Sequence, residues 1–236
     1  MFNEATLLLD LDGTLLDIAP TPDSVVVEPG LVASLTALQA GLNGALAIVT
    51  GRSIETVDGL LQHRFAAAGE HGAALRRRPD APIERPDLPS APDSWLNEAA
   101  QLAAAWPGAL MERKARGFTL HFRQVPEAGP VFQAALSRML AGAPGFHLLA
   151  GLMVWEVRPI GADKGAAVTA LMAQAPFQGR LPLFIGDDVT DEDGMRVARA
   201  MGGAGLRVDA AFGTPAGVRL WLREAAARRA WPPLPR

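Results

Sequence analysis

Near its start the chain reads Leu7-Leu8-Leu9-Asp10-Leu11-Asp12-Gly13-Thr14, and this stretch decides the fold. Leucines in a row, with no polar break, are typical of a strand buried on both faces in the middle of a parallel sheet. The strand runs directly into the carboxylates of Asp10 and Asp12. Because an unpaired carboxylate beside an apolar strand is costly, these acids indicate a functional site. The alternative is a turn whose carboxylates accept backbone N–H groups.

Two later segments repeat this pattern of an apolar strand that runs into polar residues. Leu46-Ala47-Ile48-Val49 leads into Thr50-Gly51-Arg52-Ser53, and Leu183-Phe184-Ile185 leads into the acidic run 186–193. In an open parallel sheet the carboxyl ends of the strands lie at one edge, and ligands bind there. We therefore expect the polar groups of all these junctions to converge.

The first and last thirds of the chain have a parallel α/β pattern. Leucines at helical spacing predict a helix at about 30–42, which leads to strands at 45–49 and 65–69. Such a crossover is right-handed. After Pro159 the pattern returns, with strands at 182–185 and 204–208. The tail from Trp231 has no pattern, and we expect it to be loosely held.

The middle third has a different pattern. Five prolines within residues 79–92 exclude a helix there. Two α-β-β repeats follow, with helices at 94–105 and 127–141 and strands at 109–114, 118–124, 146–150 and 153–158. This order predicts a two-layer α+β module with an antiparallel sheet. We therefore expect an α/β fold in which residues 1–77 and 160–236 form a doubly wound parallel-sheet core, and residues 78–159 form an inserted α+β domain.

Composition excludes several classes of protein. The net charge of −3 gives no basic excess for binding nucleic acid. The chain has no cysteine, which excludes disulfides, thiolate metal sites and a thiol nucleophile. Residues 1–9 are too short and too acidic for a signal peptide, and no apolar run approaches the roughly 18 residues of a membrane span. The expected compartment is the cytoplasm.

The junction motifs resemble, in the same order, those of the haloacid-dehalogenase-like (HAD) phosphatases. They are Asp10-Leu11-Asp12-Gly13-Thr14, Thr50-Gly51-Arg52, Lys164-Gly165 and Gly186-Asp187-Asp188-Val189-Thr190-Asp191. Further segments resemble the trehalose-6-phosphate phosphatase family: Asp23-Ser24-Val25-Val26-Val27, Glu70-His71-Gly72, Glu112-Arg113-Lys114, Leu120-His121-Phe122-Arg123 and Trp155-Glu156-Val157-Arg158-Pro159. The motifs span nearly the whole chain. The resemblance implies a Rossmann-like HAD core whose inserted domain is a cap over the active site.

The resemblance also implies the chemistry. Hydrolysis of a phosphate ester needs a positioned nucleophile, cations and an acid. Asp10 is then the nucleophile that forms an aspartyl-phosphate, and Asp12 is the general acid and later the base. Mg²⁺ is the implied cofactor, because the donors are hard oxygens. The family pattern places the Asp10 carboxylate, the Asp12 main-chain carbonyl and Asp187 on the metal, with Asp188 and Asp191 nearby.

Other residues are assigned to the phosphate and the sugar. Thr50, Gly51 and Arg52 form a turn at a helix start, which is a predicted anion site, and Lys164 supplies a positive charge. The predicted strands of the cap alternate polar and apolar residues. With the two residues after the third strand, they supply the expected sugar contacts: Glu70, His71, Glu112, Lys114, His121, Glu156 and Arg158. The alternative is that these side chains form the solvated face of a sheet.

The leading hypothesis is therefore a Mg²⁺-dependent phosphatase that hydrolyses trehalose 6-phosphate to trehalose and phosphate. A phosphatase of sucrose or mannosylglycerate phosphates, or a sugar phosphomutase, would keep the same core motifs. A catalytically silent sugar-phosphate sensor would lack a chemical residue, and none of the family's residues is missing. A synthase of the same pathway is expected to be a separate chain.

Overall fold

The computed structural model describes residues 2–19 and 24–234. It divides into two compact units, a first unit of Met1–Arg85 with Asp163–Arg236 and a second unit of Pro86–Ala162. Residues 78–85, expected in the inserted domain, lie in the first unit, where Leu75 and Glu84 exchange backbone hydrogen bonds of 2.8 and 2.7 Å, and residues 160–162 lie in the second unit. Asp23, quoted above for its resemblance, lies outside the described residues.

The first unit is built on a sheet with the strand order β10-β9-β1-β2-β3-β4. The strands are β1 (Ala5–Leu9), β2 (Leu46–Val49), β3 (Ala66–Gly69), β4 (Ala74–Arg76), β9 (Leu181–Gly186) and β10 (Ala204–Arg207). All neighbours pair in parallel, except that β4 runs antiparallel to β3. The strand order reverses direction at β1, which places the loops after β1, β2 and β9 at a switch point. The predicted doubly wound sheet is confirmed.

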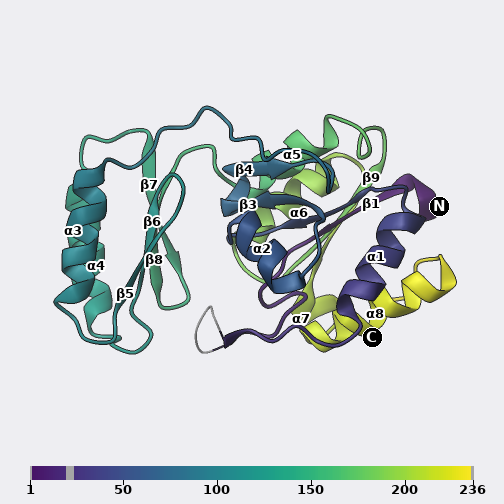
Figure 1. Ribbon diagram of the computed structural model, residues 1–236, viewed down its shortest axis with the longest axis horizontal. Coiled ribbons are helices and arrows are strands. Elements are labelled where there is room, and N and C mark those ends of the chain that lie inside the picture. Colours follow the sequence, from purple (N-terminus) through teal and green to yellow (C-terminus); the bar gives the residue numbers. More distant parts are fainter. Residues whose placement is uncertain (1, 20–23, 235–236) are drawn as a thin grey trace. The chain divides into compact units, whose positions relative to one another are not determined.

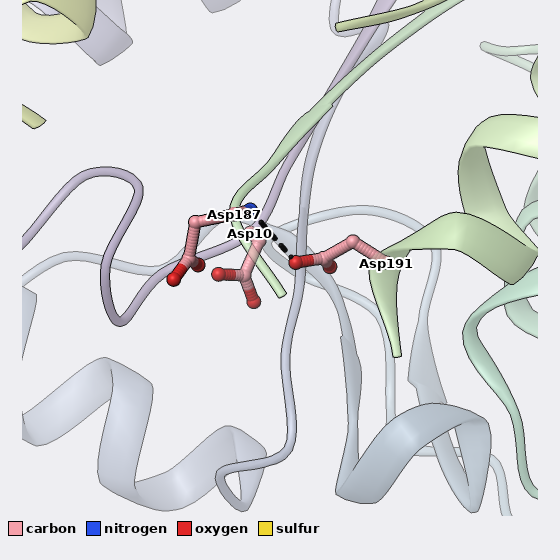
Figure 2. A group of neighbouring side chains, drawn as sticks. All are labelled: Asp10, Asp187 and Asp191. Carbon is pink, nitrogen blue, oxygen red and sulfur yellow. Dashed lines mark hydrogen bonds between the residues drawn. The ribbon is translucent and has the colours of Figure 1, made fainter. Parts of the chain in front are cut away.

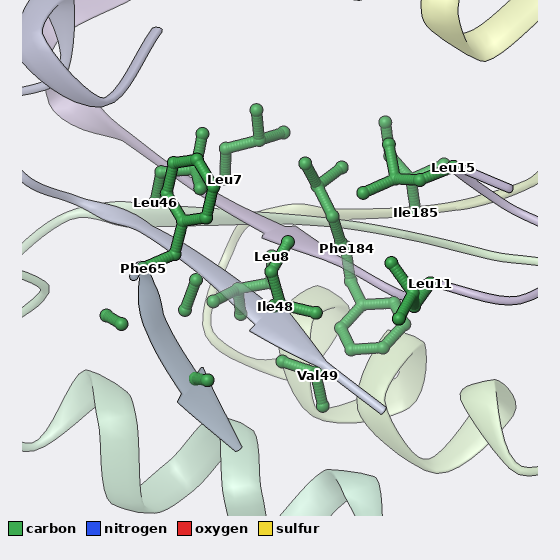
Figure 3. Packing of buried hydrophobic residues seen from close by; sticks show 14 of the residues in the cluster. Leu7, Leu8, Leu11, Leu15, Leu46, Ile48, Val49, Phe65, Phe184 and Ile185 are labelled. Atoms are coloured by element: carbon green, nitrogen blue, oxygen red, sulfur yellow. The ribbon is translucent and has the colours of Figure 1, made fainter. Parts of the chain in front are cut away.

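Helices cover this sheet on both faces. They are α1 (Leu31–Gly41), α2 (Ile54–Leu61), α5 (Lys164–Met172), α6 (Asp191–Ala200), α7 (Val208–Ala211) and α8 (Pro215–Arg228), with the 3₁₀ turns η1 (Phe2–Glu4) and η3 (Glu70–Gly72). Helices α1 and α8 pack side by side, as do α5 and α6, and the strands lie between the two pairs (Figure 1). Leu7, Leu8 and Leu9 of β1 are fully buried. Figure 3 shows Leu7 and Leu8 packed among side chains of the neighbouring strands. This is the environment that an unbroken apolar strand needs.

Two features at the C-terminus differ from the sequence prediction. Helix α8 was not expected, although Thr214 caps it and the buried residues Val218, Trp221 and Leu222 have helical spacing. The expectation of a loose tail from Trp231 is wrong for its first residues. The ring of Trp231 stacks on Trp221 at 5.3 Å, and Trp221 Nε1 donates to the Pro232 carbonyl. Aromatic burial therefore holds a segment that has no periodicity of its own.

The second unit has an antiparallel sheet with the strand order β5-β6-β8-β7. Its elements are α3 (Asp93–Ala104), β5 (Leu110–Arg113), β6 (Phe118–His121), α4 (Ala128–Met139), β7 (Phe146–Gly151) and β8 (Val154–Pro159). Both helices lie on one side of this sheet (Figure 1). The strand residues of the apolar cluster beneath them alternate along the chain: Met111, Phe118, Leu120, Phe146, Leu148, Trp155 and Val157. The predicted α+β module is confirmed, and its other sheet face carries the polar side chains of Thr119, His121 and Glu156 together with Leu110, Leu149 and Val154.

The lengths and compositions of the helices can be compared with those of a membrane-spanning helix. Over residues 2–19 and 24–234, none of them combines the length and the apolar character that crossing a bilayer requires.

Candidate active site

The structure gathers acidic side chains at the carboxyl ends of β1 and β9. Asp10 follows β1, Asp187 follows β9, and Asp191 begins α6. One oxygen atom from each of these three carboxylates lies within 4.8 Å of the other two (Figure 2). Thr14 Oγ1 lies 3.1 Å from Asp10 Oδ2 and 3.2 Å from Asp187 Oδ1, so one hydroxyl links the loops after two neighbouring strands.

Two glycines allow this close approach. Gly13 has a φ of 79°, and a Cβ atom there would overlap the carboxylate of Asp187. A Cβ atom on Gly186 would overlap the side chain of Asp191. Glycine is needed at both positions for a steric reason, and at Gly13 also for the backbone conformation.

Lys164 lies at the centre of the acidic cluster. It begins α5, is 3% exposed, and its Nζ donates to Asp10 Oδ1 at 2.7 Å and to Asp191 Oδ1 at 2.5 Å. Burial raises the pKa of Asp10 to about 7 and that of Asp191 to about 7, although the Lys164 charge opposes both shifts. Burial would lower the pKa of Lys164, but Asp10 and Asp191 overcome it and raise that pKa above its usual value. The ammonium group is therefore held charged inside the cluster.

Asp191 and Asp188 shape the loop between β9 and α6. Asp191 Oδ2 accepts hydrogen bonds from the backbone N–H groups of Asp187 and Asp188, at 2.9 and 3.0 Å. Asp188 Oδ1 accepts from the backbone N–H groups of Thr190 and Asp191, at 2.8 and 3.2 Å, and so holds the turn that leads into α6. Burial raises the pKa of Asp188, but the charge of Lys164 and the bonds from Thr190 lower it below its usual value.

A Mg²⁺ ion fits this cluster. Burial raises the pKa of Asp187, and the charges of Asp191 and Asp188 raise it further, although the hydrogen bond from Thr14 opposes the shift. The carboxylates therefore repel one another, and a cation between them would relieve that repulsion. Oxygen donors without nitrogen or sulfur are the set that Mg²⁺ prefers. Asp191 already accepts three hydrogen bonds, from Lys164 and two backbone N–H groups. Asp10 and Asp187 are therefore the carboxylates better suited to bind the ion.

Asp12 and Arg52 form a bidentate ion pair across the loops after β1 and β2. Arg52 Nε donates to Asp12 Oδ2 at 2.6 Å, and Arg52 Nη2 donates to Asp12 Oδ1 at 2.8 Å. The Arg52 side chain is 14% exposed, and the Asp12 side chain is 35% exposed. Arg52, which the sequence assigns to the substrate, therefore contacts the acid that the sequence assigns to proton transfer.

The residues after β2 and β3 also meet at this edge of the sheet. Thr50 is buried, and its carbonyl accepts the backbone N–H of His71 at 3.0 Å. Glu70 donates its backbone N–H to the Arg52 carbonyl at 2.9 Å, and its carboxylate pairs with Arg85 at 3.1 Å. The His71 ring lies over Gly51, where a Cβ atom would come within 2.6 Å of His71 Nε2.

Glu112, Lys114 and His121 interact in the second unit. Glu112 Oε1 accepts from Lys114 Nζ, and Glu112 Oε2 accepts from His121 Nε2 at 2.9 Å. Burial raises the pKa of Glu112, but the His121 bond and the Lys114 charge outweigh it and lower that pKa to about 2. Glu112 is therefore ionised over the physiological range.

The strand register places Glu156 and Arg158 on the same sheet face as Glu112. Glu112 pairs with Thr119, and Thr119 pairs with Glu156, so these residues form a row across three strands. Arg158 lies two residues further along β8 and therefore points to the same side. Arg158 is 6% exposed, and its Nε donates to His147 Nε2 at 3.1 Å. We call this side of the sheet, opposite α3 and α4, the polar face.

Three contacting residues were not assigned from the sequence. Thr14 belongs to the first motif, and its hydroxyl was the available signal. His147 could be found only from the pairing of β7 with β8, which sets it opposite Arg158. Arg207 ends β10, and its Nη2 donates to the Asp187 carbonyl at 2.8 Å. The strand order, which places β10 beside β9, was needed to find it.

Comparison with known proteins identifies relatives of this chain. The family model described as trehalose-phosphatase matches residues 8–214. A "probable trehalose-phosphate phosphatase" of Sinorhizobium fredii is 41% identical over 204 residues, which cover 86% of this chain and 77% of that protein. The trehalose-6-phosphate phosphatase of Escherichia coli is 39% identical over 201 residues, which cover 84% of this chain and 75% of that protein.

Solved structures support the fold. The C-terminal domain of the C. albicans trehalose-6-phosphate phosphatase superimposes with a TM-score of 0.78, at 20% identity, over 96% of this chain and 93% of that chain. The sucrose-phosphatase of Synechocystis, solved with sucrose and phosphate, gives a TM-score of 0.57 at 15% identity, over 97% of this chain and 91% of that chain. At these identities the likeness concerns the HAD-type core and its inserted domain.

Proposed function

The chain belongs to the trehalose-phosphatase family and is a phosphatase, and we propose that its substrate is trehalose 6-phosphate, which it hydrolyses to trehalose and phosphate. The observation that carries this proposal is the cluster of Asp10, Lys164 and Asp187 at the strand edge, in a chain whose family match extends through both units. The inserted unit matters because a core alone would not distinguish one phosphate ester from another.

We propose that Asp10 is the nucleophile. Asp10 attacks the phosphorus atom, the bond from phosphorus to the sugar oxygen breaks, and Asp12 delivers a proton to that oxygen. Water then attacks the aspartyl-phosphate, Asp12 takes a proton from the water, and phosphate leaves with Asp10 restored. The Lys164 charge supports the first step, because it favours the ionised form of Asp10 against burial.

Other core residues would orient the reacting groups. Arg52 holds both oxygens of Asp12, which supports a role in aiming the proton donor. Thr50 and the Gly51 turn would bind the phosphoryl oxygens, with His71 beside them. Asp10, Asp187 and the Asp12 carbonyl would hold Mg²⁺, which when bound offsets the negative charge of the phosphoryl group. Asp188 and Asp191 would hold the loop that carries Asp187.

We further propose that the polar face of the second unit, which would act as the cap, binds the sugar hydroxyls. Glu112, Lys114 and His121 form a bonded group there, and Glu156 lies in the same row. Charged groups that hold one another in place are suited to bind hydroxyls, because each offers a fixed donor or acceptor. Glu70 and Arg158 are mostly buried and bonded to protein partners, which favours a supporting role for both.

Substitutions on the polar face test this assignment. Loss of one hydrogen-bonding partner of a sugar hydroxyl costs about 1–3 kcal/mol, or about one to two decades in kcat/KM. Glu156→Ala and Lys114→Ala should therefore lose at least about tenfold on trehalose 6-phosphate. A small aryl phosphate, which has no sugar to bind, should be hydrolysed almost as before. The matched control is Glu98→Ala, an exposed glutamate on α3.

The outcome separates the proposals. Equal losses of kcat/KM on both substrates would mean that these side chains hold the second unit together. Unchanged kcat/KM on both would mean that they are solvated side chains with no contact to the substrate. Faster hydrolysis of a sucrose or mannosylglycerate phosphate than of trehalose 6-phosphate would leave the proposed mechanism in place and change the proposed substrate.

The cytoplasmic location and a synthase on a separate chain stay predictions.

A further inference from the structure

Arg207 contacts the loop that carries Asp187 from a neighbouring strand. It is the last residue of β10, and the parallel register sets it opposite Gly186 at the end of β9. Its Nη2 donates to the main-chain carbonyl of Asp187 at 2.8 Å. The guanidinium group therefore reaches the backbone of the candidate metal ligand and leaves the carboxylate of Asp187 free to face Asp10.

The same guanidinium group holds two other elements. Arg207 Nη1 donates to Glu192 Oε1, in the first turn of α6, at 3.1 Å. Arg207 Nε donates to Asp209 Oδ1, on α7, at 3.1 Å. One side chain thus joins the beginning of the β9–α6 loop to the helix at its end, with a rigid planar fork that a lysine does not offer.

The backbone of Asp187 is consequently held on both sides. Its N–H group donates to Asp191 Oδ2 at 2.9 Å, and its carbonyl accepts from Arg207. Fixing both peptide groups around one Cα atom fixes the direction of the Cβ atom, and with it the position of the carboxylate. Gly186, which precedes Asp187, allows Asp191 to approach closely enough to make its bond.

We propose that Arg207 is a positioning residue that pre-orients Asp187 for binding Mg²⁺. This inference rests on the proposed function, in which Asp187 is a metal ligand. Groups that orient a metal ligand typically contribute about 10–100-fold in metal affinity. The Arg207 side chain is 35% exposed, so solvent weakens its ion pairs with Glu192 and Asp209. The bond to the Asp187 carbonyl is the contact that carries the effect.

Arg199 offers a matched control. Its Nη2 donates to the Gly205 carbonyl on β10 at 2.9 Å, and its Nη1 lies 3.9 Å from Glu192. It therefore shares with Arg207 a bond to the β10 region and a charge near Glu192. Within the described part of the chain it makes no hydrogen bond to Asp187. A difference between the two arginine variants isolates the contact with the metal-ligand loop.

The experiment is a calorimetric titration of the metal-free protein with Mg²⁺. Arg207→Ala should bind Mg²⁺ about tenfold more weakly than the wild type, and Arg207→Lys, which keeps one donor group, should lie between them. Arg199→Ala should bind as the wild type does. Excess Mg²⁺ should restore most of the turnover of Arg207→Ala on trehalose 6-phosphate, whereas loss of folded protein would not be restored. Melting curves of each variant record the folded fraction.

Unchanged Mg²⁺ binding in Arg207→Ala, or an equal loss in Arg199→Ala, would overturn the inference while leaving the proposed function intact. If Arg207→Ala does not fold, Arg207→Lys decides alone, and wild-type affinity in that variant counts against the inference. A wild-type protein that binds no Mg²⁺ and hydrolyses no sugar phosphate would overturn the proposed function, and this inference with it.

Discussion

Replacing Lys164 by methionine removes the positive charge at the centre of the acidic cluster and keeps most of the side-chain volume. Lys164 is 3% exposed, and its Nζ lies 2.7 Å from Asp10 Oδ1 and 2.5 Å from Asp191 Oδ1. Breaking a buried ion pair by removing one partner costs about 3–5 kcal/mol, because the other charge stays buried without compensation. We therefore expect the Lys164→Met variant to lose about 3–5 kcal/mol in free energy of unfolding at pH 8.

The pH dependence of this loss has a defined sign. Burial raises the pKa values of Asp10 and Asp191 to about 7, and Lys164 keeps them from rising further. Without the lysine both pKa values rise, so the folded variant retains protons that the unfolded chain has released. In both proteins these carboxyls make stability fall as pH rises above about 4, but the fall levels off near pH 7 in the wild type and continues above pH 7 in the variant. The gap between wild type and variant should be widest at pH 8 and narrow at pH 5, where both carboxyls are protonated in either folded protein.

Urea unfolding of the metal-free proteins, followed by circular dichroism from pH 5 to pH 8, measures this gap. The control is Lys114→Met, the substitution of the chain's other lysine. Lys114 pairs with Glu112, and the two side chains are 16% and 37% exposed, so its loss should cost less than about 1 kcal/mol. Equal stabilities of the two variants at pH 8, or a gap that widens toward pH 5, would refute the reasoning.

Asp10→Asn should leave less than about one per cent of phosphate release and an unchanged circular dichroism spectrum, because the amide has nearly the same shape but is not a nucleophile. Activity well above that level would argue against a covalent intermediate. Gly13→Ala should lower turnover more than about tenfold, because the new methyl group displaces Asp187. Gly142→Ala is its control, since that glycine has a φ of 85° and open space around it, and similar activities of the two variants would contradict the steric argument. At pH values above 4.5, Glu112→Gln should lower the free energy of unfolding by less than about 1 kcal/mol. This loss should disappear as pH falls toward 2, because the pKa of Glu112 lies at about 2 in the folded state. A loss that persists at pH 2 in urea unfolding would assign the effect to packing instead.

The parallel core could be predicted because its signals are local. Leu7 to Leu9 form an unbroken apolar strand, and Asp10 and Asp187 each follow such a strand directly. The carboxyl edge of a parallel sheet then brings these acids together without any knowledge of the loops. The polar face and the apolar face of the second unit could also be predicted, because successive side chains along a strand point to opposite sides of the sheet.

Contacts that depend on pairing between distant strands could not be predicted. The bond from Arg158 to His147 follows from the register of β7 and β8, and the bond from Arg207 to Asp187 follows from the place of β10 beside β9. The order of apolar and polar residues within one strand determines neither pairing register. Helix α8 has a local signal, because Val218, Trp221 and Leu222 recur at helical spacing, but Gly213 and Pro215 at its start are also typical of a loop.

Phosphate release from trehalose 6-phosphate, sucrose 6-phosphate, a mannosylglycerate phosphate and glucose 6-phosphate, each with Mg²⁺ and with a chelator, tests the central claim most directly. We expect the highest kcat/KM on trehalose 6-phosphate, and release that falls to background when the metal is removed. Equal rates on all four esters would contradict the proposed substrate, and undiminished release in the chelator would contradict the proposed metal site at Asp10 and Asp187.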